Sequence, residues 1–152
     1  TTNIELAREI IERDMNVTVV TCMLDIAELF TTTKNVKFIL LGGEFNRSQN
    51  GFLGELTRQM MENFRFDICF MGVVGADLSN NVITTYVPED GIMKHDAVQK
   101  SSQCYLVMES SKFDFKANYV YATFDDVEGV ICERELPEEI KKRLEEHQTK
   151  II

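Results

Sequence analysis

Short apolar segments alternate with amphipathic segments along nearly the whole chain. Residues 17–21 are apolar and β-branched, as in a strand, and residues 24–30 repeat apolar side chains at helical spacing. A strand followed by an amphipathic helix is the repeating unit of a parallel sheet with crossover helices. The pattern therefore predicts an α/β fold with a mostly parallel central sheet flanked by helices. The predicted strands are 17–21, 37–41, 66–72, 82–86, 105–108, 119–123 and 129–132, and the predicted helices are 4–13, 24–30, 54–63, 89–102 and one that Pro137 opens.

Four of the predicted strands are too apolar to leave one face in water: 17–21, 37–41, 66–72 and 105–108. Such strands are typical of parallel sheets, because helices cover both faces of the sheet. We expect these four to be buried together in the central sheet. The residues expected in the core are Val19, Ile39, Ile68, Phe70, Leu106 and Ile131.

The length and composition are those of one ordinary domain. The chain has 152 residues, of which 44% are hydrophobic. A chain of this size buries roughly two-thirds of the surface that it exposes when unfolded. We therefore expect residues 1–152 to form a single domain. Because Thr1 and Thr2 run directly into a helical pattern without a capping lead-in, we also expect the protein to continue upstream.

The charge balance argues against direct binding to nucleic acid. Lys and Arg number 16 against 25 Asp and Glu, which gives a formal net charge of −9. No basic cluster interrupts this balance, so the DNA phosphate backbone would be repelled rather than neutralised. Any contact with DNA must come from another part of the protein.

The cysteine, histidine and hydropathy patterns predict a cytoplasmic protein without a metal or cofactor. The cysteines form no Cys-x-x-Cys pair, which fits reduced thiols. The histidines have no Cys or Asp at ligand spacing, so we expect no metal ion. There is no signal segment and no apolar run near about 18 residues, so we expect no membrane contact. These residues are Cys22, Cys69, Cys104, Cys132, His95 and His147.

The ends of the predicted strands carry the candidate binding residues. In open α/β sheets, ligands lie outside the carboxyl ends of the strands, where loops and helix N-termini present free N–H groups. A glycine there lets the backbone approach a ligand, although glycines are as common in plain turns. The candidates in these segments are Thr21, Cys22, Gly42, Gly43, Gly72, Gly75, Asp77, Glu109 and Lys112.

Three further features suit the binding of a phosphate group. The segment 110–112 places two hydroxyls and one cation directly after an apolar strand. Glu89 and Lys94 lie at the start of one helix, where Lys94 offers a point charge to an anion, although a solvated ion pair is the plainer interpretation. Thr1 and Thr2 begin a helix, so their hydroxyls suit either a phosphate or an ordinary helix cap.

Taken in order, these motifs resemble the C-terminal domain of the DeoR family of bacterial repressors. The resemblance runs from Thr1 to Ile152, and its specificity lies in the order and spacing rather than in any single motif. The matching motifs are Val19-Val20-Thr21, Leu40-Leu41-Gly42-Gly43-Glu44, Asp67-Ile68-Cys69-Phe70-Met71-Gly72-Val73-Val74-Gly75, Thr84-Thr85 with Glu89 and Lys94, and Ser110-Ser111-Lys112-Phe113.

The resemblance implies a sensor domain for a phosphorylated sugar or a related catabolic intermediate. In that family a winged helix-turn-helix domain at the N-terminus binds operator DNA, and this domain is absent from residues 1–152. The implied fold is similar to ribose-5-phosphate isomerase and coenzyme A transferases. Thr1-Thr2 would end a Gly-Thr-Thr phosphate loop, and Lys94 would be the family's binding lysine. The resemblance also implies that the protein works as a homo-oligomer.

Three positions depart from the family pattern. Cys22 stands where the family often has Asn, and Glu109 stands where it often has Asp before Ser-Ser-Lys-Phe. Near the end, Cys132 and Glu133 replace a Thr-Asp pair. These changes alter polar groups at strand ends, so they bear on which sugar binds rather than on the fold.

Two other functions stay open at this point. A sugar-phosphate isomerase needs a base that moves a proton between adjacent carbons, and Asp77, Glu89 or Glu109 could serve. However, Asp77 is followed by Leu78, where the isomerase loop would carry paired carboxylates. The third alternative is an oligomerisation module whose pocket is vestigial.

Overall fold

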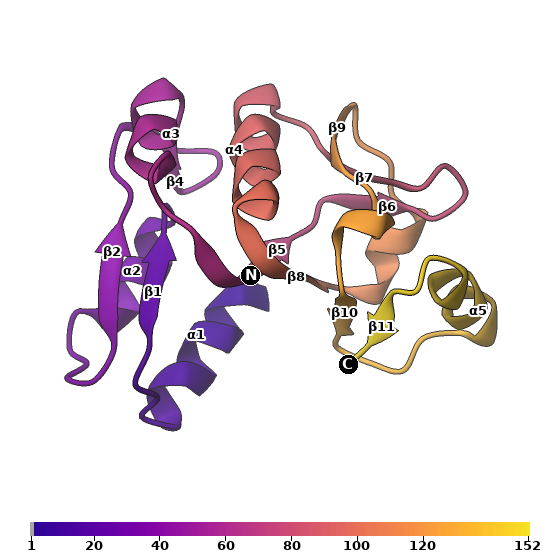
Figure 1. The fold of residues 1–152 in the computed structure, drawn as a ribbon, viewed down its shortest axis with the longest axis horizontal. Coiled ribbons are helices and arrows are strands. Elements are labelled where there is room, and N and C mark those ends of the chain that lie inside the picture. Colours follow the sequence, from indigo (N-terminus) through magenta and orange to yellow (C-terminus); the bar gives the residue numbers. More distant parts are fainter. Residues whose placement is uncertain (1) are drawn as a thin grey trace. The chain divides into compact units, whose positions relative to one another are not determined.

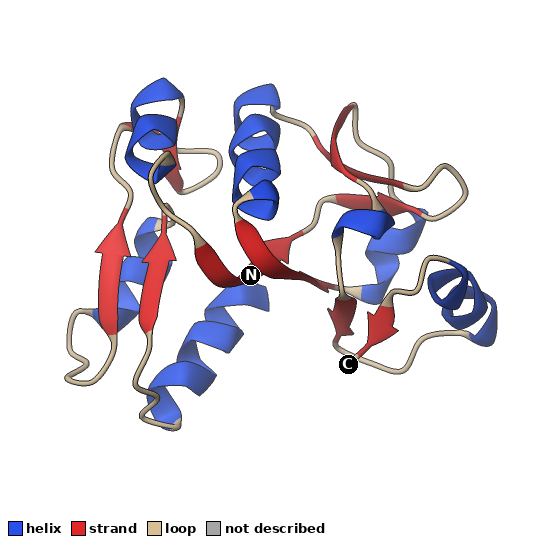
Figure 2. Ribbon diagram, in the orientation of Figure 1, coloured by secondary structure: helices blue, strands red, loops and turns tan. Residues whose placement is uncertain are grey.

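The computed structural model describes residues 2–152, apart from the side chain at position 114. The chain divides into two compact units, Thr1–Asn63 and Phe64–Ile152, and each is considered separately. Figure 1 colours the chain from indigo at the N-terminus to yellow at the C-terminus, and Figure 2 shows helices in blue and strands in red. Among the described residues, no helix is long and apolar enough to cross a membrane.

The first unit contains a small parallel sheet and a β-hairpin. Its two parallel strands pair in register from Thr18 opposite Lys37 to Thr21 opposite Leu40. A second, antiparallel pair follows, with Phe45 opposite Phe52. In chain order the elements are α1 (Thr2–Glu12), β1 (Thr18–Thr21), α2 (Leu24–Phe30), β2 (Lys37–Leu40), β3 (Glu44–Asn46), β4 (Gly51–Leu53) and α3 (Glu55–Met61).

The core of the first unit is small. Helices α1 and α2 contact each other, because both place apolar residues on one face. The fully buried members of this cluster are Ala7, Ile26, Phe30 and Val36. Around them lie half-buried side chains, including Val19 on β1, so most of this core is still partly exposed to solvent.

The second unit contains a four-stranded parallel sheet and a three-stranded antiparallel sheet. The strand order is β11-β10-β8-β5 in the parallel sheet and β6-β7-β9 in the antiparallel sheet. The elements are β5 (Phe66–Gly72), β6 (Gly75–Asp77), β7 (Val82–Thr85), α4 (Pro88–Gln99), β8 (Ser101–Met108), η1 (Ser110–Asp114), β9 (Tyr119–Ala122), η2 (Phe124–Asp126), β10 (Gly129–Cys132), α5 (Glu138–Glu146) and β11 (Lys150–Ile151).

Helix α4 joins the two sheets of this unit. It contacts β5 and β8 of the parallel sheet as well as β7 and β9 of the antiparallel sheet (Figure 1). Pro88 begins the helix, where its missing N–H is tolerated. Gly91 allows close contact, because a Cβ there would collide with the ring of Tyr119. The core between these elements includes Leu106, Phe124 and Val130, each of which is fully buried.

The structure confirms the predicted fold class, because a parallel sheet is flanked by helices in a mixed α/β fold. However, the expectation that four strands share one sheet is wrong. β1 and β2 form a two-stranded sheet of their own, whereas β5 and β8 belong to the four-stranded sheet. Strand pairing depends on partners far along the chain, which an apolar pattern does not specify.

The expected core is also only partly right. Leu106 is fully buried at 0% exposure, whereas Ile68 is 47% exposed. Ile68 lies on β5, which is the edge strand of its sheet, so part of its surface has no neighbour among the described residues. Val19, Ile39, Phe70 and Ile131 are half-buried.

Element boundaries differ from the predictions at several points. Helix α4 ends at Gln99, and β8 begins at Ser101, four residues earlier than the strand predicted from residue 105. The polar residues at 101–103 hide this part of the strand in the sequence, and Ser102 and Gln103 are exposed. The short strands β3, β4, β6 and β11 are absent from the predictions, because segments of two or three residues carry no readable periodicity.

Candidate functional site

The carboxyl ends of the parallel strands in the second unit lie at one edge of the sheet. The register places Gly72 of β5 opposite Val107 of β8, and Met108 of β8 opposite Cys132 of β10. The residues that follow these ends are therefore neighbours, as expected for a parallel sheet. This edge carries Gly72, Glu109 and the residues after Cys132.

At this edge, Ser110 is bound to a carboxylate that does not belong to the predicted site. The Ser110 amide donates to Glu133 Oε2 at 2.8 Å, and the Ser110 hydroxyl donates to Glu133 Oε1 at 2.8 Å. Arg134 Nε donates to Ser110 Oγ at 2.6 Å. The hydrogen bonds from Ser110 hold the pKa of Glu133 below its usual range. In the sequence, Glu133 stands out only as a departure from the family pattern.

Lys112 lies in the 3₁₀ turn η1 that follows β8. Its amide donates to the carbonyl of Glu109 at 3.0 Å, which fixes the turn. Its ammonium lies 5.8 Å from the centroid of the Phe115 ring. A cation over an aromatic face is attracted by the ring without losing its charge. Within the described part of the chain, Lys112 has no carboxylate partner, and Glu109 is exposed.

Asp77 shapes the turn between β6 and β7 and pairs with a lysine. It accepts hydrogen bonds from the amides of Ser79 and Asn80 at 3.0 and 3.2 Å and from Asn80 Nδ2 at 2.7 Å. Lys116 Nζ lies 2.8 Å from Asp77 Oδ2. The hydrogen bond from Lys116, followed by that from Asn80, lowers the pKa of Asp77 to about 2. Asp77 is therefore a turn residue that is ionised at neutral pH.

Gly75 is required by the protein's own packing. A Cβ at this position would collide with the carbonyl oxygen of Phe115 and would lie 2.8 Å from Thr84 Oγ1. The Thr84 hydroxyl donates to the Gly75 carbonyl at 3.2 Å and accepts from the Ala117 amide at 3.1 Å. The sequence predicts that a glycine lets the backbone be approached closely, and this is seen at Gly75. The group that approaches Gly75 is the chain segment after Lys112.

Lys94 pairs with Asp90 rather than with its predicted neighbour. Its ammonium lies 2.8 Å from Asp90 Oδ2, and the Thr85 hydroxyl donates to the same oxygen at 2.7 Å. The predicted partner Glu89 is exposed instead. The i,i+4 spacing of Asp90 and Lys94 places them one turn apart on the same helical face and is the signal in the sequence that could have found this pair.

The Asp90–Lys94 pair lies largely inside the protein. The Lys94 and Asp90 side chains are only 18% and 11% exposed. The ammonium also lies 5.4 Å from the centroid of the Tyr121 ring. Burial raises the pKa of Tyr121 well above its usual value, so its hydroxyl is neutral. A charge held this firmly is positioned rather than freely mobile.

Strand β7 contacts both the segment 115–117 and the Asp90–Lys94 pair of α4. Thr84 binds the segment 115–117, and Thr85 binds Asp90 of α4. Because successive side chains of a strand point to opposite faces, the two hydroxyls serve different sides of β7. Within the second unit, the structure therefore links Gly75, Lys94 and the segment after Lys112 through one strand.

The candidates in the first unit lie at the carboxyl ends of β1 and β2. Thr21 Oγ1 accepts from the Met23 amide at 3.1 Å, and the Cys22 carbonyl accepts from the Phe52 amide at 2.8 Å. Gly43 has a φ of +146°, and a Cβ there would collide with Thr57 Oγ1. Gly42 has open space around its Cα. Thr2 lies in the first turn of α1, and Thr1 lies outside the described residues.

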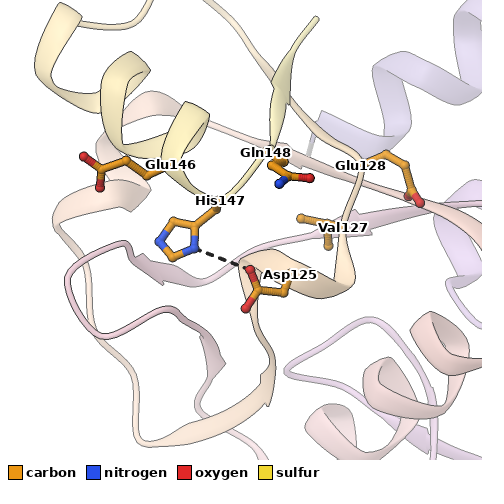
Figure 3. A pocket seen from close by; sticks show the side chains of 6 residues that line it. All are labelled: Asp125, Val127, Glu128, Glu146, His147 and Gln148. Atoms are coloured by element: carbon orange, nitrogen blue, oxygen red, sulfur yellow. Dashed lines mark ion pairs between the residues drawn. The ribbon is translucent and has the colours of Figure 1, made fainter.

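A pocket of about 380 Å³ lies elsewhere, at the end of α5. None of the predicted binding residues lines it. The His147 ring stacks on that of Phe124. Its Nδ1 lies 3.5 Å from Asp125 Oδ1, which is the ion pair drawn in Figure 3. The acidic lining would repel an anionic ligand. The lining residues are Asp125, Val127, Glu128, Glu146, His147 and Gln148. Among the residues that the structure describes, no group of three or more His, Cys, Asp or Glu could hold a metal ion.

Comparison with known proteins identifies the family to which the chain belongs. The model of the DeoR C terminal sensor domain matches residues 1–134. The HTH-type transcriptional regulator IolR of Bacillus subtilis is 28% identical over 133 residues, which cover 88% of this chain and 53% of that protein. The transcriptional repressor AccR of Agrobacterium fabrum is 25% identical over 150 residues, covering 94% of this chain and 58% of AccR.

A third relative is the glycerol-3-phosphate regulon repressor of Escherichia coli, 25% identical over 136 residues, which cover 90% of this chain and 54% of the repressor. The chain thus spans little more than half the length of the curated relatives that it matches. Since the family model covers most of the chain, and the motifs at its strand ends follow the same order, the chain belongs to the DeoR C-terminal sensor domain family.

Proposed function

We propose that residues 1–152 serve as one effector-binding domain that binds a phosphorylated sugar or a related catabolic intermediate. The observation that carries this proposal is the set of lysines around β7 in an otherwise acidic chain. Lys94 lies over Tyr121 of β9, and Lys116 pairs with Asp77 of β6; both of these strands flank β7. Lys112 lies over Phe115, next to the segment that Thr84 of β7 binds, although the whole chain carries a formal net charge of −9. The name of the glycerol-3-phosphate regulon repressor, one of the relatives, is consistent with a small phosphorylated ligand.

Lys112 is the cation best placed to meet a phosphate. Lys94 is engaged by Asp90 at 2.8 Å, and Lys116 by Asp77 at 2.8 Å. Lys112 instead lies over the Phe115 ring. Among the described residues its ammonium has no carboxylate partner, so it is available to an incoming anion. Lys94 adds a charge that Asp90 of α4 holds in position.

The proposed role in the whole protein is control of operator binding. A winged helix-turn-helix domain upstream would contact the DNA, and the bound effector would favour one of two arrangements of the oligomer. The longer relatives are named as transcriptional regulators, which supports such a whole protein. We place this protein in the cytoplasm, where such a regulator meets both its effector and its operator.

We propose further that the domain is not an isomerase. A general base must be able to take up a proton near the working pH, and a carboxyl with a pKa of about 2 is a poor acceptor. Asp77 is also fully occupied by the turn and by Lys116. The two remaining acids, Glu89 and Glu109, are exposed to water. The relatives, which are named as regulators, favour the same conclusion.

Titration calorimetry with a panel of sugar phosphates and their unphosphorylated sugars tests the proposal. Charge-assisted contacts to phosphate contribute about 1.5–3 kcal/mol each, so Lys112→Ala should weaken binding by roughly ten- to a hundredfold. Lys94→Met should have a similar effect, because it removes the charge and keeps the aliphatic stem. Lys142→Ala, at an exposed lysine of α5, is the matched control and should bind like the unchanged chain.

Three outcomes separate the alternatives. Binding that is lost in both lysine variants supports the proposal, whereas binding that is equal for the unphosphorylated sugar contradicts it. Turnover of a bound sugar phosphate in an isomerisation assay would favour the enzyme. A protein that binds its ligand gains roughly 2.7 kcal/mol in its free energy of unfolding when the ligand is at about a hundred times the dissociation constant. An oligomerisation module with a vestigial pocket would show no such stabilisation.

A further inference from the structure

Two exposed aromatic rings lie beside Lys112. The side chains of Tyr86 and Phe115 are 53% and 43% exposed. Their ring centroids are 6.0 Å apart, and the planes meet at 86°, which is an edge-to-face pair. Lys112 Nζ lies 5.8 Å from the centroid of Phe115. The chain therefore presents two apolar rings and one ammonium at a single place on its surface.

The backbone that carries these rings is firmly held. The Phe115 amide donates to the Lys112 carbonyl at 3.2 Å, and the Ala117 amide donates to Thr84 Oγ1 at 3.1 Å. Between them, Lys116 pairs with Asp77. Tyr86 follows directly on β7, whose Thr84 and Thr85 are buried. Both rings are thus exposed, although hydrogen bonds hold the main chain around Phe115 and Tyr86 directly follows a buried strand end.

The end of β7 and the segment after η1 bring the two rings together. Tyr86 is the first residue after the end of β7 at Thr85, and its ring lies edge-to-face with that of Phe115. Thr84 is the residue that binds the segment carrying Phe115. The contact between Tyr86 and Phe115 follows from this arrangement. Exposed large apolar rings that gather next to a charged group are typical of a ligand surface rather than of ordinary solvent-facing side chains.

We propose that Tyr86 and Phe115 form a stacking platform that selects effectors with a ring-form sugar. This inference rests on the proposed function, because Lys112 would hold the phosphate while the rings contact the sugar. One face of a pyranose carries several C–H groups and is apolar enough to lie on an aromatic ring. A short acyclic phosphate has no such face, so it would gain only the contact with Lys112.

The platform also has a matched counterpart elsewhere in the chain. Phe45 in the first unit is 41% exposed and pairs edge-to-face with Phe52 at a centroid distance of 5.5 Å. Phe45 has the same kind of ring and nearly the same exposure as Phe115, but no lysine contacts it among the described interactions. Phe45→Ala is therefore the control for simple loss of an exposed aromatic ring.

The experiment compares affinities by calorimetry for the chain and for the variants Phe115→Ala, Phe115→Leu, Tyr86→Ala and Phe45→Ala. The probes are glucose 6-phosphate, galactose 6-phosphate and N-acetylglucosamine 6-phosphate as ring sugars, with glycerol 3-phosphate as the acyclic ligand. Aromatic contacts predict a loss of roughly three- to tenfold for the ring sugar in Phe115→Ala and Tyr86→Ala, and about twofold or less for glycerol 3-phosphate. Phe115→Leu keeps an apolar side chain and should still lose most of this affinity. Phe45→Ala should bind normally.

The outcomes distinguish the two proposals. Suppose that the unchanged chain binds a ring-sugar phosphate and that Phe115→Ala and Tyr86→Ala bind it equally well. The platform is then overturned and phosphate sensing stands, and the same holds if the unchanged chain binds only glycerol 3-phosphate. If none of the four probes binds, the platform and the proposed function fall together. Circular dichroism of each variant shows whether it is folded, and a Phe115→Leu variant that is folded and unaffected also overturns stacking.

Discussion

The two units of the chain differ in how completely they bury their strands. Among the described residues, the unit Phe64–Ile152 contains a connected core of sixteen buried hydrophobic residues between a four-stranded and a three-stranded sheet. The unit Thr1–Asn63 has a cluster of four, and its parallel sheet has two strands. A parallel sheet is stable when both of its faces are covered, so we expect the second unit to be the more stable of the two. The contrast indicates that the fold does not gain its stability evenly along the chain.

Matched phenylalanines, one in each unit, should give the strongest effect. Phe124 and Phe30 are 0% and 1% exposed. Replacing either by alanine leaves a cavity and should lower the free energy of unfolding of its own unit by about 3–5 kcal/mol. We expect Phe124→Ala to loosen β8 and β10, whereas Phe30→Ala should expose the amides of α2 and leave β8 protected. Hydrogen exchange measured by mass spectrometry resolves the two units.

A different result would contradict this contrast between the units. If Phe30→Ala accelerates hydrogen exchange in β8 as much as in α2, the two units unfold together. The difference between their cores would then have no effect on how each unit unfolds. Leu56→Ala serves as the control, because Leu56 is 65% exposed and its replacement should change the free energy of unfolding by no more than about 0.5 kcal/mol.

A smaller loss of stability is expected from replacing one of two glycines, Gly91, but not the other, Gly42. A Cβ at Gly91 in α4 would collide with the Tyr119 ring, whereas a Cβ at Gly42 meets nothing within 4 Å. Overpacking of this kind typically costs about 1–3 kcal/mol, so Gly91→Ala should lower the urea midpoint. Gly42→Ala should leave the midpoint unchanged or raise it slightly, because alanine restricts the unfolded chain. Equal midpoints for the two variants would show that Tyr119 moves aside without loss.

The turn at Asp77 predicts an acid-dependent effect of smaller size. Its pKa is lowered from 3.8 to about 2 in the folded protein, so the carboxylate form stabilises the fold. This stability is present above about pH 4 and is lost as the pH falls from about 4 to about 2. Because Lys116 is 67% exposed, solvent screening limits the effect to about 1 kcal/mol.

Asp77→Asn tests this point. The variant should lose the ion pair at neutral pH and show a flatter dependence of stability on pH between about 4 and 2 in urea titrations. An unchanged slope would mean that Asp77 contributes nothing to acid sensitivity. Asp67→Asn is a useful control, since Asp67 is an exposed carboxylate with no ion pair among the described contacts.

The weakest effect concerns thiol reactivity and changes no stability. The pKa of Cys69 is lowered chiefly by a hydrogen bond from the Cys104 thiol, which lies opposite it in the register of β5 and β8. Burial raises the pKa of Cys132 to about 11. Because the thiolate is the reactive form, Cys69 should be alkylated several-fold faster than Cys132 at about pH 8. Mass spectrometry after brief iodoacetamide treatment measures both, and the reverse order would contradict the assignment.

The types of element and the family can be deduced from the amino-acid sequence alone. Apolar runs such as 66–72 and 129–132 match β5 and β10 residue for residue, because side-chain periodicity is a local property of strands. The order of motifs along the chain points to the DeoR family, and the family model confirms it. The candidate lysines Lys94 and Lys112 are also visible in the sequence, and their role in binding stays a prediction.

Contacts between distant residues, in contrast, follow from the tertiary structure. Local patterns do not encode strand partners, so the separate β1–β2 sheet and the exposure of Ile68 could not be predicted. Polar partners depend on distance in space, which is why Asp90 rather than Glu89 holds Lys94. The contact of Phe115 with Tyr86 joins residues far apart in the sequence, so the proposed platform depends on the folded chain bringing the segment after η1 to the end of β7.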